Sequence, residues 1–372
     1  MPVDHLHRIT ERDIAQLRTV FEEFNALVEK LALTDAQVHA FDETKVSATA
    51  EDACHARVIH RRGAKPYRRV GVKTHKAALV AFISANGQTL PPAMLHPQDK
   101  RVPREHAQAW DTASHQPDTL HLAAGSTATM TAFLYDQPFL HWDDHLPIGL
   151  PQLVLQDGYG AHYNVTTLLR LANRTGHCDG EIYRQDGRAR VYVLSYPPAL
   201  TRLIAPPDHS ACFGAFQRAR HRLMTEAGGV AELAQLFHMA GTAYARTFSE
   251  HNVHDAFRWC GFTTGPERLM RQRHFVGVLE QYLAAQAWLD QHGREHVILR
   301  RLARPVGLGA DVQRPPRVRL GVGTKTIGVI NDDDNIVALV RELHRIKAAN
   351  AKAQAKRTDA DRKRPSAKRS KR

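Results

Sequence analysis

The sequence predicts an α/β protein with a mixed β-sheet flanked by helices. Two observations support this prediction. Short, strongly apolar segments such as KAALVAFIS (76–84) and PQLVLQ (151–156) are typical of buried strands. Amphipathic segments such as RITERDIAQLRTVFEEFNALVEKLA (8–32) are typical of helices that cover a sheet. The chain has 372 residues, 43% of them hydrophobic, and is therefore long enough to bury a sizeable core.

The first elements are a helix and three strands. Residues 8–32 carry apolar side chains at helical spacing, and Thr10 followed by an acid three positions later forms an N-terminal capping signal. Residues 36–46 alternate between two faces, as a strand does. The strand predicted at 76–84 is followed by Asn86-Gly87, a hairpin signal because both residues tolerate positive φ. The return strand then completes a β-meander.

The rest of the chain alternates strands and helices. We expect an irregular polar insertion over 97–125, followed by a helix broken near Pro138. Next come a buried strand that ends at Asp157 and a helix that stops at Gly176. A second buried strand follows, and then a helix that starts directly after Asp208. A meander followed by two β/α units is the layout of the ribonuclease H-like fold.

The predicted domain organisation places this fold between helical and basic segments. We expect an N-terminal helix (1–34), the ribonuclease H-like domain (35–228), a helical extension (229–300), a linker with a short helix (301–344), and a disordered basic tail (345–372). In the helical extension, Asn252 or Glu250 is the expected cap of one helix. The tail carries 12 Lys or Arg and 2 Asp, so it holds +10 of the chain's net charge of +13. Nuclear import, contact with nucleic-acid phosphates, and simple solubilisation are the alternatives for such a tail.

Composition excludes several classes of protein. No apolar run is long enough to cross a bilayer, and the polar N-terminus does not resemble a secretory signal. The four cysteines are widely spaced and contain no C-x-x-C pair. This spacing argues against a disulfide framework and against a zinc finger, and suits a reducing compartment.

Three aspartates stand at or just beyond the ends of apolar strands: Asp42, Asp157 and Asp208. If the strands are neighbours, these carboxylates meet at one edge of the sheet, where a cation is needed to offset their repulsion. Hard oxygen ligands suit Mg²⁺ or Mn²⁺. Each aspartate also has a plain structural interpretation: a strand end, a turn with the following Gly158, and a helix N-cap, respectively.

Around these aspartates the sequence resembles the DDE superfamily of endonucleases, in the pogo/Tigger/jerky branch of the mariner-type transposases. Three ordered blocks carry the resemblance: FDET (41–44), LVLQDGYGAH (153–162) and YPPALTRLIAPPDHSACFGAF (196–216). The segment NVHDAFRWCGF (252–262) resembles the closing block of the same family. The similarity extends over roughly residues 35–266.

The resemblance implies a function. Asp42, Asp157 and Asp208 would ligate two Mg²⁺ or Mn²⁺ ions, and DNA strands would be cut and joined by in-line displacement at phosphorus. Glu43 and His162 match family positions as auxiliary residues, with packing or a plain hydrogen bond as the alternative role of His162. The resemblance implies DNA as the partner. The basic tail predicts a nuclear location and binding to a nuclear import receptor, and a homodimer is a further expectation. The predicted phosphate contacts of the tail are Arg362, Lys363, Arg364, Lys368, Arg369, Lys371 and Arg372.

The sequence also departs from the family. Only about one helix precedes Asp42, so the family's helix-turn-helix DNA-binding modules are missing from this sequence. Ala199, Leu200, Arg202 and Ala205 replace residues that are usually polar. A catalytically inactive nuclear DNA-binding protein is therefore the alternative hypothesis, and hydrolysis of another phosphoester is a third.

Overall fold

The computed structural model describes most of the chain. The described residues are 9–47, 76–125, 128, 130–147, 149–158, 162, 164–172, 174–176, 182–184, 189–197, 200–227, 232–292 and 328–363. Of the segment predicted to be a linker with a short helix (301–344), residues 301–327 lie outside them. None of the helices within these ranges is long and apolar enough to cross a membrane.

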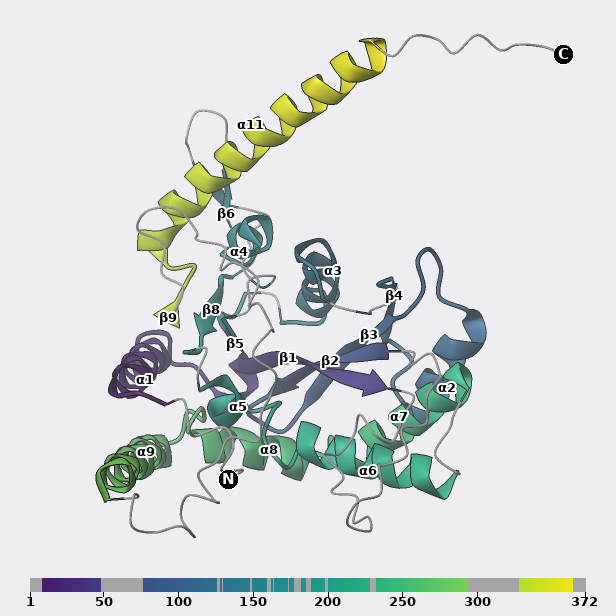
Figure 1. The fold of residues 1–372 in the computed structure, drawn as a ribbon. Helices are drawn as coiled ribbons and strands as arrows, with labels where there is room; N and C mark the ends of the chain where they lie inside the picture. The colour runs from purple at the N-terminus through teal and green to yellow at the C-terminus, as the bar shows by residue number, and fades with distance from the viewer. Residues whose placement is uncertain are drawn as a thin grey trace, which may run out of the picture.

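A seven-stranded mixed sheet forms the centre of the molecule, with strand order β4-β3-β2-β1-β5-β8-β9 (Figure 1). Its strands are β1 (Val38–Ser47), β2 (Lys76–Ser84), β3 (Thr89–His96), β4 (Leu120–Ala123), β5 (Gln152–Gln156), β8 (Val191–Ser195) and β9 (Gly328–Val329). A separate hairpin pairs β6 (Arg174–Gly176) with β7 (Ile182–Arg184).

The sheet has ribonuclease H-like topology, which confirms the predicted fold class. Strands β1, β2 and β3 form an antiparallel meander, with Asn86-Gly87 in the connection between the second and third strands. Strand β5 then pairs parallel to β1, and β8 pairs parallel to β5. Strands β4 and β9 extend the two edges.

Helices cover both faces of the sheet and enclose two cores (Figure 1). The first core packs α1 (Glu11–Leu31), α5 (Thr201–Ile204), α6 (Phe213–Glu226), α7 (Leu233–Thr247), α8 (Glu250–Cys260) and α9 (Glu267–His292) against one face. The second packs α3 (Ala132–Asp143), α4 (Val165–Leu171) and α11 (Asp333–Lys363) against the other. Side-chain alternation along β1 divides them, since Ala40 belongs to the first core and Phe41 to the second.

Helix α1 begins as the sequence predicts. The Thr10 side chain accepts a hydrogen bond from the Asp13 amide, and the Asp13 carboxylate accepts one from the Thr10 amide. This capping box satisfies two amide groups that have no partner within the helix.

The prediction of an irregular insertion over 97–125 is wrong. This segment forms helix α2 (Arg104–Ser114) and the edge strand β4. The polar composition hid the helix, because Trp110 and Ser114 are its only fully buried side chains. Trp110 packs against Tyr244 of α7, with ring centroids 5.6 Å apart, and donates a hydrogen bond to Thr119. Long-range packing therefore fixes a helix that has little apolar periodicity.

Three predicted helix boundaries also differ from the structure. Helix α3 runs unbroken through Pro138. Helix α4 ends at Leu171, and Gly176 lies instead in strand β6. The N-cap of α8 is Ser249, whose side chain accepts a hydrogen bond from the Asn252 amide, rather than Glu250 or Asn252.

The C-terminal segment differs most from the prediction. Helix α11 is 31 residues long rather than short, and it continues into the segment predicted to be a disordered tail. That prediction is wrong over 345–363, while 364–372 lie outside the described residues. Alanine recurs through 348–355, and its high helix propensity outweighs the repulsion between basic side chains. The far part of α11 projects away from the sheet (Figure 1). The domain boundaries themselves stay predictions.

Candidate functional site

Strand register brings two of the three predicted aspartates to the same level. Parallel strands β1 and β5 pair Ala40 with Leu155. Two residues further along both strands lie Asp42 and Asp157, at the point where β5 has ended and β1 continues. The Asp42 side chain points to the face of the first core, as that of Ala40 does, because strand residues two apart share a face.

The third aspartate, Asp208, comes after strand β8 as predicted, but it does not cap the helix that follows. Asp208 lies in a series of turns between the short helix α5 and helix α6, where its amide donates to the carbonyl of Ala205. It is not the N-cap of α6, which begins at Phe213 after Cys212. The correction has a local cause: backbone hydrogen bonds from His209 to Pro206 and from Cys212 to His209 satisfy the turn before the helix starts. Asp208 is half-buried, and both preceding prolines are buried.

The three aspartates interact electrostatically at Asp42. Asp42 is 8% exposed, and its pKa is raised well above the ordinary value. Burial is the main cause, followed by the charges of Asp208, Asp157 and Glu43, whereas a hydrogen bond from the Glu43 amide (2.8 Å) opposes the shift. The charges of three other carboxyl groups therefore act on one buried carboxyl group.

A buried histidine links two of these carboxyl groups. His162 Nδ1 contacts Asp157 Oδ1, and its Nε2 lies 3.1 Å from Glu43 Oε2. Burial lowers the pKa of His162, which is 1% exposed, but the two carboxylates outweigh burial and raise it well above its ordinary value. His162 is thus held as an imidazolium between two acids. This contact brings together Asp157 and the two residues predicted to be auxiliary.

The histidine is fixed in place by the second core. Its ring lies 5.1 Å from that of Phe41 and 5.1 Å from that of Tyr135, measured between centroids. The Tyr135 hydroxyl donates to the side chain of Gln156, whose amide nitrogen in turn donates to the carbonyl of His162 at 3.3 Å. Ring packing and a hydrogen-bond chain therefore orient the imidazole beside Asp157.

Helix α6 fastens the far end of the strand that carries Asp42. Gln217 donates to the Thr44 hydroxyl (2.9 Å) and to the Lys45 carbonyl (2.8 Å). Arg220, 1% exposed, donates to the carbonyl of Ser47 at 2.6 Å. Sequence reasoning did not predict this contact, because it joins residues more than 170 positions apart.

The donor set fits a hard divalent cation. All the acids around Asp42 offer oxygen ligands, and a cation would relieve the repulsion that raises the pKa of Asp42. Within the described ranges, no three His, Cys, Asp or Glu side chains are arranged to ligate one ion together. Mg²⁺ in phosphoryl-transfer sites is commonly held by one or two carboxylates plus water and phosphate.

The predicted nucleic-acid contacts are only partly within the described structure. Arg362 and Lys363 lie at the end of α11, whereas Arg364, Lys368, Arg369, Lys371 and Arg372 lie outside it. Their role stays a prediction. On the same helix, residues 346–353 are all exposed, Lys347 and Lys352 among them.

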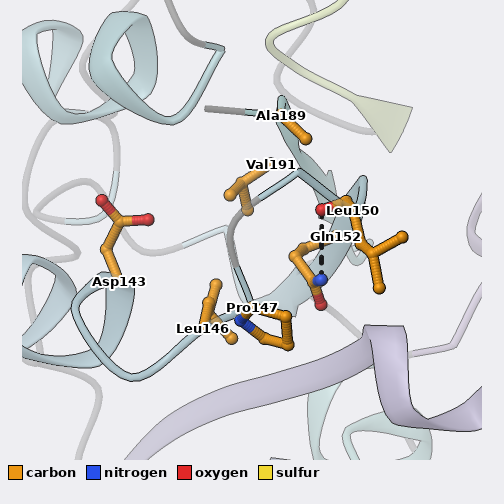
Figure 2. A pocket seen from close by; sticks show the side chains of 7 residues that line it. All are labelled: Asp143, Leu146, Pro147, Leu150, Gln152, Ala189 and Val191. Atoms are coloured by element: carbon orange, nitrogen blue, oxygen red, sulfur yellow. Dashed lines mark hydrogen bonds between the residues drawn. The ribbon is translucent and has the colours of Figure 1, made fainter. Parts of the chain in front are cut away.

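Figure 2 shows a small hollow on the surface of the protein. Its lining residues include Asp143, Leu146 and Leu150, together with Gln152 and Val191, the first residues of β5 and β8. Asp157 follows the opposite end of β5, so this hollow is separate from the acidic cluster.

Fold and site together define the chain as an α/β protein with a ribonuclease H-like sheet and acidic residues on the central strand β1, just after β5, and in the turns before α6. No protein-family model matches the sequence, and no curated protein matches it. Solved structures of Mos1 transposase show a distant resemblance. A paired-end complex with the left transposon end has a TM-score of 0.34 and 13% identity over 67% of this chain and 63% of that chain. A pre-cleavage Mos1 transpososome has a TM-score of 0.34 and 12% identity over 67% and 64%, respectively. The match thus spans less than two thirds of the Mos1 chain, and the fold assignment rests on the strand order and register given above.

Proposed function

We propose that this chain is a DDE-type domain that cuts and joins DNA phosphodiesters, with Asp42, Asp157 and Asp208 as the ligands of Mg²⁺ or Mn²⁺. The observation that carries the proposal is the electrostatic coupling of the other two aspartates to Asp42, on a sheet whose register puts Asp42 and Asp157 at one level. The three sequence blocks that resemble the pogo/Tigger/jerky branch support the same assignment.

In this proposal each residue has a defined task. Divalent ions, when bound, supply activation of the attacking oxygen and stabilisation of the leaving oxygen. Asp42 would share an ion with Asp157 and another with Asp208, since the charges of both act on its carboxyl group. His162 orients Asp157 and offsets part of its charge, and Glu43 holds the other side of the imidazole. The chain's own residues thus provide a preorganised set of ligands.

A second candidate function is DNA binding without cleavage. The exposed, basic part of α11 favours it, because Lys347 and Lys352 lie on a helix that projects from the body with residues 346–353 exposed (Figure 1). Such a helix fits the negatively charged DNA backbone without requiring the aspartates. A nuclear location through the basic C-terminal segment belongs to both proposals.

One experiment separates the two functions. The full chain is incubated with supercoiled plasmid in Mg²⁺, in Mn²⁺, or in chelator, and compared with Asp157→Asn and with the control Asp99→Asn, an exposed acid outside the cluster. The catalytic proposal predicts that the unmodified chain nicks the plasmid only with a divalent metal. Asp157→Asn should abolish this nicking, and Asp99→Asn should retain it. Nicking in chelator, or nicking unchanged by Asp157→Asn, contradicts the catalytic proposal.

DNA affinity is measured in parallel at several salt concentrations. Non-cleaving binding predicts that affinity survives loss of all three aspartates and falls sharply when residues 345–372 are deleted. Each lost phosphate contact lowers the slope of log affinity against log salt by about 0.9. An unchanged slope after the deletion contradicts the assignment of DNA contacts to this segment.

A further inference from the structure

Tyr196 carries a buried hydroxyl group that has no assigned role. The residue directly follows β8, is 1% exposed, and packs its ring against Phe262 with 5.6 Å between centroids. Within the part of the chain that the structure describes, no hydrogen-bond partner lies within reach of the hydroxyl oxygen. A buried polar group without a partner costs stability, and phenylalanine would fill the same space without that cost.

The backbone places Tyr196 at the level of the acidic cluster. Its amide donates to the carbonyl of Gln156 at 2.9 Å, which continues the β5–β8 ladder by one step and sets Tyr196 opposite Asp157. The side chain belongs to the first core, on the face to which Asp42 points. The hydroxyl is therefore on the same side of the sheet as Asp42.

Electrostatics agree with this placement. The pKa of Tyr196 is raised well above its ordinary value by burial first, then by Cys260 and by Asp42, Asp208 and Asp157. All three candidate ligands are thus close enough to act on this hydroxyl, and its proton stays in place at physiological pH. The hydroxyl is therefore a buried hydrogen-bond donor on the side of the sheet to which Asp42 points.

We propose that Tyr196 is a positioning residue of the acidic site, donating a hydrogen bond to an aspartate carboxylate when a divalent cation is bound. The inference rests on the proposed function. A carboxylate that ligates a cation with one oxygen keeps acceptor capacity on the other, and such ligands are normally held by a neighbouring donor. Asp42 has the Glu43 amide and Asp157 has His162. Among the residues that the structure describes, the Tyr196 hydroxyl is a buried donor on this face of the sheet that has no hydrogen-bond partner.

The alternative is that Tyr196 is a core residue whose hydroxyl serves nothing. Tyr244 provides a matched control, because it is also 1% exposed, lies in the same core, and has a pKa raised by burial without any contribution from the aspartates. Tyr196→Phe and Tyr244→Phe each remove one buried hydroxyl from the same cluster. Only the first removes a donor next to the acids.

The test measures Mn²⁺ binding to the full chain by electron paramagnetic resonance. The midpoint of urea unfolding is measured separately, without metal. For Tyr196→Phe we expect Mn²⁺ affinity to fall about tenfold, the loss of one hydrogen bond to a charged acceptor, with an unfolding midpoint equal to or above that of the unmodified chain. Tyr244→Phe should bind Mn²⁺ normally. Unchanged affinity in Tyr196→Phe, or equal losses in the two variants, overturns the inference.

The same titration separates failure of this inference from failure of the proposed function. If the unmodified chain binds Mn²⁺, Asp157→Asn loses it and Tyr196→Phe keeps it, the acidic site stands and Tyr196 has no part in it. If the unmodified chain does not bind Mn²⁺, both the metal-dependent function and the role of Tyr196 are refuted.

Discussion

The stability of this protein should fall as the pH falls because of His39, which lies on the strand that carries Asp42. His39 is 3% exposed, with its Nε2 2.8 Å from Gln152 Oε1 and its Nδ1 2.7 Å from the Ser84 hydroxyl. The Gln152 amide nitrogen donates to the Leu150 carbonyl, so its oxygen faces the imidazole and Nε2 carries the proton. The neutral ring is thus fully satisfied in the folded state.

The size of the effect follows from the pKa of His39. Burial lowers it from 6.5 to about 4, against a smaller opposing contribution from the Gln152 hydrogen bond. Between these two pH values the unfolded chain binds a proton that the folded chain does not. The free energy of unfolding therefore falls as pH falls through this window, and the contribution is fully present above pH 6.5. The total loss is about 3 kcal/mol, at about 1.36 kcal/mol for each pH unit.

Urea unfolding of the full chain and of His39→Gln, at a series of pH values across this window, measures the effect. The variant removes the titrating group, so its stability should fall less steeply with decreasing pH. His96, whose burial lowers its pKa to about 3, contributes to both proteins alike and cancels in the comparison. If the two proteins lose stability in parallel, within about 1 kcal/mol, the assignment of the pH dependence to His39 is refuted.

Two further substitutions test the contacts around the site. His162→Gln removes the positive charge between two partly buried carboxylates and should lower the free energy of unfolding by about 2 kcal/mol. His251→Gln, at an exposed pair, should cost less than about 0.5 kcal/mol, and equal costs in urea unfolding would contradict the role given to the imidazolium. Gly328→Ala should lower the unfolding temperature, because Gly328 has φ +84° and an added methyl group would overlap the Glu23 carboxylate. Gly277→Ala, in a helix with open space around it, should raise that temperature, and two changes of the same sign would refute the steric argument.

The central sheet could be predicted from sequence because its signals are local. Alternation in β1, the apolar run of β2 and the Asn86-Gly87 turn each specify their own segment, and the structure has all three. That Asp42 and Asp157 lie side by side on neighbouring strands follows from the parallel pairing that this fold class implies. These parts need no knowledge of distant residues.

The parts that sequence could not predict depend on distant contacts. Tyr196 directly follows an apolar strand in the sequence, and only the assembled sheet sets it opposite Asp157, in the core to which Asp42 points. The contact between His162 and Glu43 joins residues 119 positions apart. The start of α6 at Phe213 reflects a turn closed by its own backbone hydrogen bonds, which a Pro-Pro-Asp pattern does not distinguish from an N-cap.

The edge strand β9 has a consequence for the order in which the protein is made. It pairs with β8 although more than 130 residues separate them in the chain. Its neighbour Asn331 also bonds to the backbone of Val193 and Val191. During synthesis the ribosome therefore releases β8 long before the segment that covers it, and the nascent sheet carries an unpaired edge until then. Premature termination before Gly328 would leave this edge open to pairing with other chains, so shortened products should self-associate where the full chain does not.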